Sequence, residues 1–460
     1  MKNLTGIIMS NLQDKKNNTL TITAKPSNKV SGNILVPGDK SCSHRSIMFG
    51  ALAEGTTHIS GFLPGQDCLA TMNTFKAMGI EIEGPDSEHN VTVHGKGLHG
   101  LSKPEALLDI GNSGTSIRLL SGILAGQRFE TRMAGDNSLN KRPMGRVITP
   151  LQLMGANITA ASDGTPPVVC SGLAADEKLN AIDYLLPMAS AQVKSCVLLA
   201  GMYANGTTSV TEPGITRDHT ERMLTAFGYP VKSIETEQGK KISIEGGHKL
   251  TACDIQVPGD ISSATFFMVA GLIAKEGQIT IRNVGMNPTR IGAINILQQM
   301  NGKILVTNER LAGGEPVADL VVSSSPLKGI DIDERDVPLA IDEFPAIFIA
   351  AACATGITRL RGAEELRVKE SDRIQAMADG LVELGIDCTV YPDGIDITGG
   401  QLTSGTVESH DDHRIAMSFA ISSLRATGEI TILECDNVAT SFPNFVALAN
   451  QVGLTLIPNN

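Results

Sequence analysis

The chain has 460 residues, a formal net charge of −11, 42% hydrophobic residues and 19% charged residues, which is typical of a globular protein of two or three domains. The acidic charge, the aromatic content of 3% and the absence of Trp argue against nucleic-acid binding, which usually needs a basic face or stacking aromatic rings. Because no apolar stretch of about 18 residues occurs, no transmembrane helix is expected.

The first segment, MKNLTGIIMSNLQDKKNN (1–18), has only a very short apolar patch. It lacks the apolar core of a signal peptide and is expected to be a polar, loosely ordered leader. Eight cysteines are scattered at positions 42, 68, 170, 196, 253, 353, 388 and 435. No two form a CxxC motif in this long chain, which favours reduced thiols in a cytoplasmic protein over a disulfide framework.

One pattern then recurs along the chain. Small polar residues precede an apolar helix rich in Ala and Gly, and a Gly turn and an alternating strand follow. The clearest copies are VPGDKSCSHRSIMFGALAEGTTHISGF (36–62) and VPGDISSATFFMVAGLIAKEGQITIRNV (257–284). In chain order the predicted first helices lie within 36–62, 110–126, 186–210, 257–284, 340–360 and 409–433. They carry almost no charge along their bodies, which predicts burial on all sides.

A second helix-then-strand pattern follows each copy. Apolar residues three and four positions apart mark one buried helix face, and a Gly ends each helix. The segments are 68–83, 144–160, 221–233, 292–306, 372–390 and 445–457. A period of roughly 75 residues is too long for a solenoid and suits a βαβ-type unit with extra strands. Six such units, three to a domain, predict two domains, with chain crossings near the two VPGD segments.

Polar and charged residues gather at the first turns of the first helices. They are Lys40, Ser41, Arg45, Asn112, Ser113, Thr115, Ser190, Gln192, Asp342, Glu343, Asp412, His413 and Arg414. A helix N-terminus has free N–H groups and a partial positive charge, so it favours anions. For any one helix, ordinary N-capping explains the pattern. The recurrence, with added Lys and Arg, favours a site for a multiply anionic small ligand.

These motifs, in this order, resemble the 5-enolpyruvylshikimate-3-phosphate synthase family, the enolpyruvyl transferases of the shikimate pathway. The resemblance runs from about residue 22 to the end and rests on PGDKSCSHR, DIGNSGTSIRLL, NKRPMGR, ASAQVKS, TRDHTE, AIDEFP, RVKESDR and DDHRIAM. It implies an α/β fold of two similar domains, each of three βαβαββ units around a pseudo-threefold axis, known as an inside-out barrel. The first domain is expected at 38–257 and the second at 258–460, and the leader and first strands at 1–37 are expected to belong to the second domain.

The resemblance also implies a reaction. The enolpyruvyl group of phosphoenolpyruvate passes to the 5-hydroxyl of shikimate 3-phosphate through a tetrahedral intermediate, phosphate is released, and no cofactor or metal takes part. The protein would be a cytoplasmic, monomeric transferase of chorismate and aromatic amino acid biosynthesis, without a membrane or nucleic-acid partner. Two domains that share the anion-binding groups would close on the substrates and exclude water.

For shikimate 3-phosphate, the resemblance assigns Lys40, Ser41, Arg45, Ser190, Ala191, Gln192, Arg217, Asp342 and Lys369. Hydroxyl groups and backbone amides suit phosphate because they donate short hydrogen bonds, and Arg adds a planar pair of donors. Many relatives have Ser in place of Ala191 and Tyr in place of Arg217, so one hydroxyl is missing and one cation is added. The structural alternative for Arg217 is an exposed salt bridge with Asp218 or Glu221.

For phosphoenolpyruvate, the resemblance assigns Lys40, Gly114, Arg142, Gln192, Arg373 and Arg414, with Lys369 as a further cation. Gly114 would let the backbone approach the ligand, although GNSGTS is not a Walker loop because no GK[ST] follows. Many relatives have Lys where Thr440 stands, which puts one phosphate contact in doubt. Glyphosate competes for this pocket in the family. Gly114 favours sensitivity and the SAQ and TRDHT segments favour tolerance, so the response is open.

Three residues are assigned to catalysis. Asp342 would face the 5-hydroxyl, Glu370 would serve C3 of phosphoenolpyruvate, and Lys40 would support both anions and the hydroxyl proton. Unaided, Asp342 reads as a helix-capping acid and KESDR as a charged first turn. His44 is expected to be a neutral neighbour of the phosphate pocket. The HDDH segment (410–413) offers a His-x-x-His pair without a matched third ligand, so no metal site is predicted.

Two other functions stay open at this point. The UDP-N-acetylglucosamine enolpyruvyl transferases share the fold and commonly carry a reactive Cys, or in some an Asp, in a mobile loop. Segment 127–146 has no Cys but contains Asp136. A non-catalytic module is the other alternative, and the presence of Lys40, Asp342, Glu370 and Arg414 argues against it.

Overall fold

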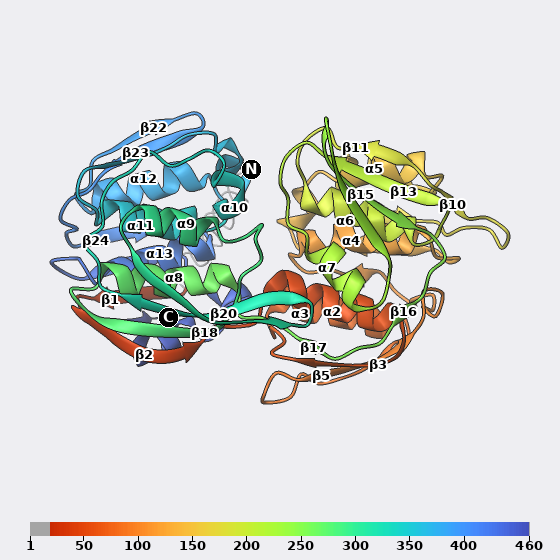
Figure 1. Cartoon of the computed structure of the whole chain (residues 1–460), viewed down its shortest axis with the longest axis horizontal. Coiled ribbons are helices and arrows are strands. Elements are labelled where there is room, and N and C mark those ends of the chain that lie inside the picture. The colour runs from red at the N-terminus through yellow and green to blue at the C-terminus, as the bar shows by residue number, and fades with distance from the viewer. Residues whose placement is uncertain (1–18, 460) are drawn as a thin grey trace, which may run out of the picture. The chain divides into compact units, whose positions relative to one another are not determined.

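The computed structural model describes residues 19–459, so the predicted leader at 1–18 lies outside the described residues. The described chain divides into two compact units (Figure 1). Unit 1 comprises residues 19–36, 259–309 and 318–459, and unit 2 comprises residues 37–258 and 310–317. Within the described residues, no helix is both long and apolar enough to cross a membrane, and all eight cysteines are free thiols.

Unit 2 alternates short strands with helices. Its helices are α2 Lys40–Leu52, α3 Gln66–Ala77, α4 Gly114–Ala125, η1 Leu139–Lys141, α5 Gly145–Leu153, α6 Ala191–Gly201 and α7 His219–Ala226. Its strands are β3 Ala53–Ser60, β4 Glu81–Glu83, β5 Val91–Lys96, β6 Leu108–Asp109, β7 Thr131–Ala134, β8 Ile158–Thr159, β9 Val168–Cys170, β10 Leu179–Asn180, β11 Asp183–Leu185, β12 Ala204–Asn205, β13 Thr207–Glu212, β14 Val231–Thr236, β15 Gly239–Glu245, β16 Leu250–Thr251 and β17 Ile255–Gln256.

Unit 1 has the same alternation. Its helices are α8 Ile261–Ile273, α9 Gly292–Gln299, α10 Val337–Ala340, α11 Phe344–Ala352, η2 Glu364–Val368, α12 Arg373–Glu383, α13 His413–Ser422, α14 Val438–Ser441 and α15 Phe445–Gln451. Its strands are β1 Thr21–Lys25, β2 Lys29–Leu35, β18 Glu276–Gly285, β21 Ile357–Leu360, β22 Cys388–Tyr391, β23 Gly394–Thr398, β24 Gly405–Glu408, β25 Ile430–Leu433 and β26 Thr455–Asn459. Strands β19 Lys303–Ala312 and β20 Glu315–Ser323 belong to unit 1 except for their ends within 310–317, which belong to unit 2.

The same sheet pattern returns in both units. In unit 2, β6 pairs parallel with β7, which pairs antiparallel with β9, and β9 pairs antiparallel with β8. The order β11-β13-β15-β14 repeats this pattern. In unit 1, the order β24-β25-β1-β26 repeats it again. This recurrence is the repeat expected from the sequence.

The helices predicted from the small, uncharged pattern are buried. All 13 residues of α8 and all nine of α11 are buried, and 11 of the 13 residues of α2 are buried. In unit 1, Figure 1 shows α8, α11 and α13 between β22 and β23 on one side and β1 and β2 on the other. Each of the twelve predicted segments contains a helix. Their Ala and Gly residues leave little side-chain volume, which lets neighbouring backbones approach closely.

One segment departs from the predicted boundaries. The sequence placed 258–460 together, whereas residues 310–317 cluster with unit 2. This segment is the tip between β19 and β20, where Gly313 and Gly314 adopt positive φ values of 56° and 84°. A side chain at Gly313 would lie 3.0 Å from the carbonyl oxygen of Gln256, which belongs to unit 2. The glycines therefore permit both the turn and the close approach. The periodic pattern of the sequence does not indicate that this tip belongs to unit 2.

Candidate active site

In unit 2, the N-terminal turns of three buried helices meet. His44 of α2 lies 3.2 Å from Ser116 of α4 through its Nδ1 atom. Arg45 of α2 donates to Ser195 of α6 at 3.2 Å. In a third contact, Arg118 of α4 donates to Gln192 of α6 at 2.5 Å. The amino ends of α2, α4 and α6, with their partial positive charge, are thereby gathered in one half-site.

The first turn of α2 holds the predicted lysine. Asp39 caps the helix by accepting from the backbone N–H of Cys42 at 2.8 Å, and Lys40 begins the helix with its ammonium paired to Asp67. Lys40 and Ser41 are partly buried. An anion arriving at Lys40 therefore competes with the Asp67 carboxylate for the same ammonium group.

Arg45, which the sequence suggested as a residue that binds phosphate, is more deeply buried than expected. It is 3% exposed, and burial lowers the pKa of its guanidinium. Its three nitrogens donate to Thr220 at 2.7 Å, to the carbonyl of Ser41 at 3.0 Å and to Ser195 at 3.2 Å. Since a guanidinium has five N–H groups, Arg45 orders this half-site and keeps donors for a ligand. His44 is fully buried, and its pKa is lowered to about 3 by burial, so the imidazole is neutral as expected.

A group of arginines lies at the amino end of α4. A Cβ atom at Gly114 would lie 3.0 Å from Nη1 of Arg142 and 3.4 Å from Nη1 of Arg118, and Arg142 donates to Asn112 at 2.9 Å. Burial, with the nearby charges of Arg142 and Arg146, lowers the pKa of Arg118 to about 10. Clustered like charges are unfavourable unless an anion neutralises them. Arg118 was missed by the sequence reasoning, although it is the single charged residue in the apolar segment SIRLL.

The amino end of α6 carries the ASAQ residues. Ser190 caps the helix, and its Oγ accepts from the backbone N–H of Val193 at 3.4 Å. Because the Ser190 oxygen acts as the acceptor in this cap, the hydroxyl group can still donate its proton in a hydrogen bond to an anion. Ala191 and Gln192 are partly buried first-turn residues, and Gln192 also donates to Thr115 at 3.1 Å.

Arg217 lies in the loop before α7 and is partly buried. Each of the two acids considered for its surface salt bridge contacts another basic side chain. Asp218 accepts from Arg222 at 2.9 Å, and Glu221 lies 2.6 Å from the buried ammonium of Lys194.

In unit 1, Arg373 is the centre of a second half-site. Its side chain is 1% exposed and lies 2.7 Å from Asp412, 2.6 Å from Glu370 and 3.5 Å from Asp342. Despite burial, these carboxylates raise its pKa. Arg373 was assigned to phosphoenolpyruvate. The structure gives it three carboxylate partners, so its direct contact with that ligand stays a prediction.

The remaining assigned residues of unit 1 meet at Asp342. The Lys369 ammonium lies 3.6 Å from its carboxylate, and Arg414 donates to its backbone carbonyl at 3.0 Å. Lys369 also pairs with Glu365 at 2.7 Å. The structure thus brings Asp342, Lys369, Glu370, Arg373 and Arg414 together from three segments of unit 1.

Two titrating groups of this half-site have displaced pKa values. Burial opposes ionisation of Glu370, but Arg373, His413 and Arg414 outweigh it and lower the pKa of this carboxyl to about 2. Burial, reinforced by the charge of Arg414, lowers the pKa of His413 to about 4. At neutral pH the pair is therefore a carboxylate beside a neutral imidazole. Glu370 is in the form of a base.

A further carboxylate, Glu343, was expected only as an acid in the first turn of a helix. Glu343 is 2% exposed and lies 3.3 Å from Arg290 and 4.0 Å from Arg414. It also accepts from Ser262 in the first turn of α8. Glu343 therefore ties Arg414 to the amino end of α8. The apolar flanks of the IDEFP segment were the available signal, because an acid there is buried and must be paired.

Two groups among the described residues have the donor spacing of a metal site: Cys42, His219 and Glu315, which are buried, and Glu81, Glu83 and His94, which are mostly exposed. The His410–His413 pair is in neither group.

The chain has repeated α/β units whose helices begin beside cationic side chains, and this fold is that of the enolpyruvyl transferases. The solved structure of the enolpyruvyl transferase NikO from Streptomyces tendae shares it, with a TM-score of 0.77 at 16% identity over 96% of this chain and 99% of that chain. The chain belongs to the EPSP synthase (3-phosphoshikimate 1-carboxyvinyltransferase) family, whose model matches residues 24–448. The predicted family and fold class are confirmed.

Individual relatives are similar over nearly their whole length. The chain is 59% identical to the 3-phosphoshikimate 1-carboxyvinyltransferase of Methylococcus capsulatus over 437 residues, which are 95% of this chain and 98% of the relative. It is 57% identical to that of Hydrogenovibrio crunogenus over 442 residues, 95% of this chain and 98% of the relative. The solved EPSP synthase of Acinetobacter baumannii has a TM-score of 0.89 at 58% identity over 96% of this chain and 100% of that chain.

Proposed function

We propose that the chain catalyses its family's reaction: the enolpyruvyl group of phosphoenolpyruvate passes to the 5-hydroxyl of shikimate 3-phosphate, and phosphate leaves. The single observation that carries this is the gathering of arginines at the amino end of α4, where a Cβ atom at Gly114 would lie 3.0 Å from Arg142 and 3.4 Å from Arg118. Burial and the charges of Arg142 and Arg146 lower the pKa of Arg118, and a bound anion would offset this effect. The family matched over residues 24–448 supplies the identity of the anions.

The cations divide between the two substrates. Ser41, Arg45, Ser190, Ala191, Gln192, Arg217, Asp342 and Lys369 bind shikimate 3-phosphate. Gly114, Arg142, Gln192, Arg373 and Arg414 bind phosphoenolpyruvate, and Arg118 joins them. Lys40 serves both substrates. Guanidinium groups suit this task because they donate two parallel hydrogen bonds to a phosphate or carboxylate.

The proton transfers fall to Asp342, Glu370 and Lys40. In the addition step, the 5-oxygen forms a bond to C2 of phosphoenolpyruvate, the hydroxyl proton passes toward Asp342 and Lys40, and C3 gains a proton from Glu370. In the elimination step, the bond from C2 to the phosphate oxygen breaks, C3 returns a proton to Glu370, and the proton taken from the hydroxyl passes from Asp342 and Lys40 to the leaving phosphate. Anionic substrates beside Arg373 and Arg414 offset the cations that hold the Glu370 pKa near 2. Binding therefore moves this pKa toward the working range of a general acid and base.

The finer organisation follows the family. The two units correspond to two enolpyruvyl transferase domains, and the enzyme works as a cytoplasmic monomer without cofactor, membrane or nucleic-acid partner. Gel filtration with light scattering checks the monomer.

A phosphate-release assay with both substrates tests the function. Wild type should release phosphate only when shikimate 3-phosphate and phosphoenolpyruvate are both present. Arg414→Met should lose most of this rate, because it removes a cation without opening the buried pair of Arg373 and Asp412. Arg335→Met is the matched control, since Arg335 is exposed and pairs with Asp333. Turnover with UDP-N-acetylglucosamine, or none with shikimate 3-phosphate, would overturn the proposal.

A further inference from the structure

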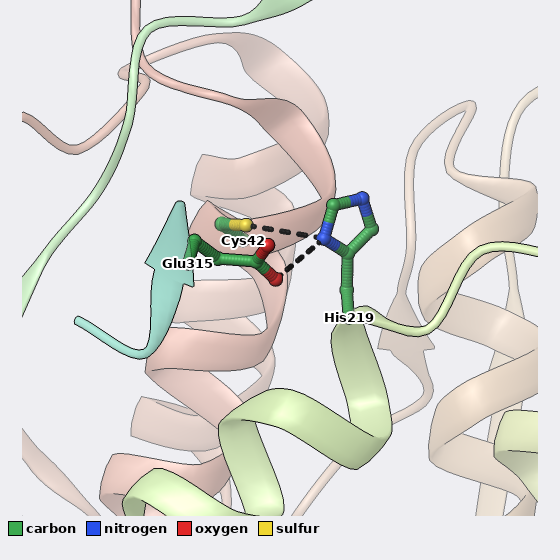
Figure 2. Close-up of side chains that lie close together, drawn as sticks. All are labelled: Cys42, His219 and Glu315. Atoms are coloured by element: carbon green, nitrogen blue, oxygen red, sulfur yellow. Dashed lines mark hydrogen bonds and ion pairs between the residues drawn. The ribbon is translucent and has the colours of Figure 1, made fainter. Parts of the chain in front are cut away.

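A second group of reactive side chains lies in unit 2. Cys42 of α2, His219 of α7 and Glu315 of β20 point toward one another (Figure 2). The Cys42 sulfur lies 3.6 Å from Nδ1 of His219, and a Glu315 oxygen lies 2.8 Å from the same nitrogen. All three ligand atoms lie within 4.8 Å of one another. The residues are 1%, 3% and 2% exposed, respectively.

The geometry is not that of a nucleophilic triad. In a triad, the nucleophile and the carboxylate contact opposite ring nitrogens, so that the imidazole relays a proton between them. Here the sulfur and the carboxylate oxygen both approach Nδ1, as Figure 2 shows. Sulfur, nitrogen and oxygen therefore lie within 4.8 Å of one another, close enough to bind one ion.

The spacing can be compared with a tetrahedral zinc site. Zn–S and Zn–N bonds of about 2.3 and 2.05 Å at a tetrahedral angle put sulfur and nitrogen about 3.6 Å apart. The observed separation of Cys42 and His219 is 3.6 Å. A Zn–O bond of about 2.1 Å beside the same Zn–N bond puts nitrogen and oxygen about 3.4 Å apart. The Glu315 oxygen lies 2.8 Å from Nδ1 of His219, which is a hydrogen-bonding distance. It would have to move away from this nitrogen by about 0.6 Å to become a zinc ligand.

The surroundings of Glu315 allow that adjustment. It directly follows Gly313 and Gly314, the positive-φ glycines at the tip between β19 and β20. The second carboxylate oxygen of Glu315 lies 4.0 Å from Arg222, which is held by Asp218 at 2.9 Å. Outer groups of this kind orient a ligating carboxylate.

We propose that Cys42, His219 and Glu315 form a zinc-binding site that ties α2, α7 and the tip of β20 together. Mixed sulfur, nitrogen and oxygen donors suit Zn²⁺, and a solvent molecule would complete four-coordination. On binding, the Zn–S bond replaces the S–H bond of Cys42 and the proton leaves to solvent. Without the ion, the N–H at Nδ1 of His219 donates to Glu315 at 2.8 Å, and zinc binding at Nδ1 moves that proton to Nε2. The thiolate and the carboxylate balance the two charges of the ion.

Cobalt titration tests the site in the full-length, reduced protein after treatment with a chelator and desalting. Co²⁺ reports a cysteine ligand through thiolate-to-metal charge-transfer absorption. Wild type should show this band saturating at one equivalent, and Zn²⁺ should displace it. The band should vanish in Cys42→Ser, while His219→Gln and Glu315→Gln should weaken binding by at least about 10-fold to 100-fold, the loss seen for outer-shell partners alone.

The chain offers a matched control. His94→Gln removes the exposed group of Glu81, Glu83 and His94 and should leave both the band and its affinity unchanged. Zn²⁺ should raise the melting temperature of wild type and of His94→Gln but not of Cys42→Ser, because an ion that binds only the folded state stabilises it. Circular dichroism verifies that each variant is folded. A wild type without a thiolate band, or a band that survives in Cys42→Ser, would overturn the proposal, as would affinity lost only in His94→Gln.

Discussion

Replacing Arg373 by methionine tests the central claim about the unit 1 half-site, that one buried guanidinium holds its carboxylates in place. The side chain of Arg373 is 1% exposed and that of Asp412 is 0% exposed, with 2.7 Å between Nε and Oδ2. Methionine fills much of the volume and removes the charge. Asp412 is then left as a buried carboxylate without its cation, an event that costs about 3–5 kcal/mol in buried ion pairs.

The matched control is Arg335→Met in the same unit. Arg335 also pairs with an aspartate, Asp333, at 2.5 Å, but its side chain is 89% exposed. Exposed pairs contribute little to stability because water and salt screen them, so this variant should unfold almost as wild type does.

Urea unfolding followed by circular dichroism at pH 7 measures the two differences from wild type. We expect a loss of about 3–5 kcal/mol for Arg373→Met and a much smaller loss for Arg335→Met. Equal, small losses in the two variants would refute the reasoning. They would mean that burial does not make the Arg373 network more costly to break than a surface pair.

Three further outcomes are expected. Glu370→Gln should lower kcat by about 10²-fold or more, because the amide cannot exchange the C3 proton. Its neighbour variant Glu364→Gln should turn over normally, and near-normal kcat in Glu370→Gln would remove this residue from the mechanism. Gly114→Ala should raise KM for phosphoenolpyruvate more than for shikimate 3-phosphate, because the added methyl would lie 3.0 Å from Arg142; steady-state kinetics with each substrate varied in turn measure the split. The pKa of His44 is lowered to about 3 in the folded chain. Below about pH 6.5, the unfolded chain therefore takes up a proton at His44 that the folded chain does not. The free energy of unfolding should fall as the pH drops from about 6.5 toward 3, by at most about 1.4 kcal/mol per pH unit. Urea titrations across this window should be flatter for His44→Gln, and an unchanged slope would contradict the neutral state of His44.

The repeated architecture could be predicted from the sequence because its signal is local. Alanine- and glycine-rich segments without charge, such as ISSATFFMVAGLI in α8, read directly as buried helices. Capping is local as well. Ser113, Ser190 and Asp412 occupy the N-cap positions that their types suggested.

The charge partners could not be predicted in the same way. Arg373 and Asp412 lie 39 residues apart, and Cys42 and His219 lie 177 residues apart. The spacing of residues within one helix or strand cannot predict pairs that are so far apart in the sequence. Resemblance supplied the assigned residues but not their surroundings, so Arg45 and Arg373 were expected as ligands, whereas the structure engages both guanidinium groups with protein atoms.

The pairing of β1 has a consequence for synthesis on the ribosome. Ile22 of β1 lies opposite Ile432 of β25 and Pro458 of β26, so β1 is made before unit 2 and its partner strands are made after it. Unit 2 is complete once residue 317 has emerged, while β1 still lacks its neighbours. Domains generally fold as units as they emerge, so unit 2 is able to assemble before unit 1. Until then, the unpaired edges of β1 are open to other nascent chains.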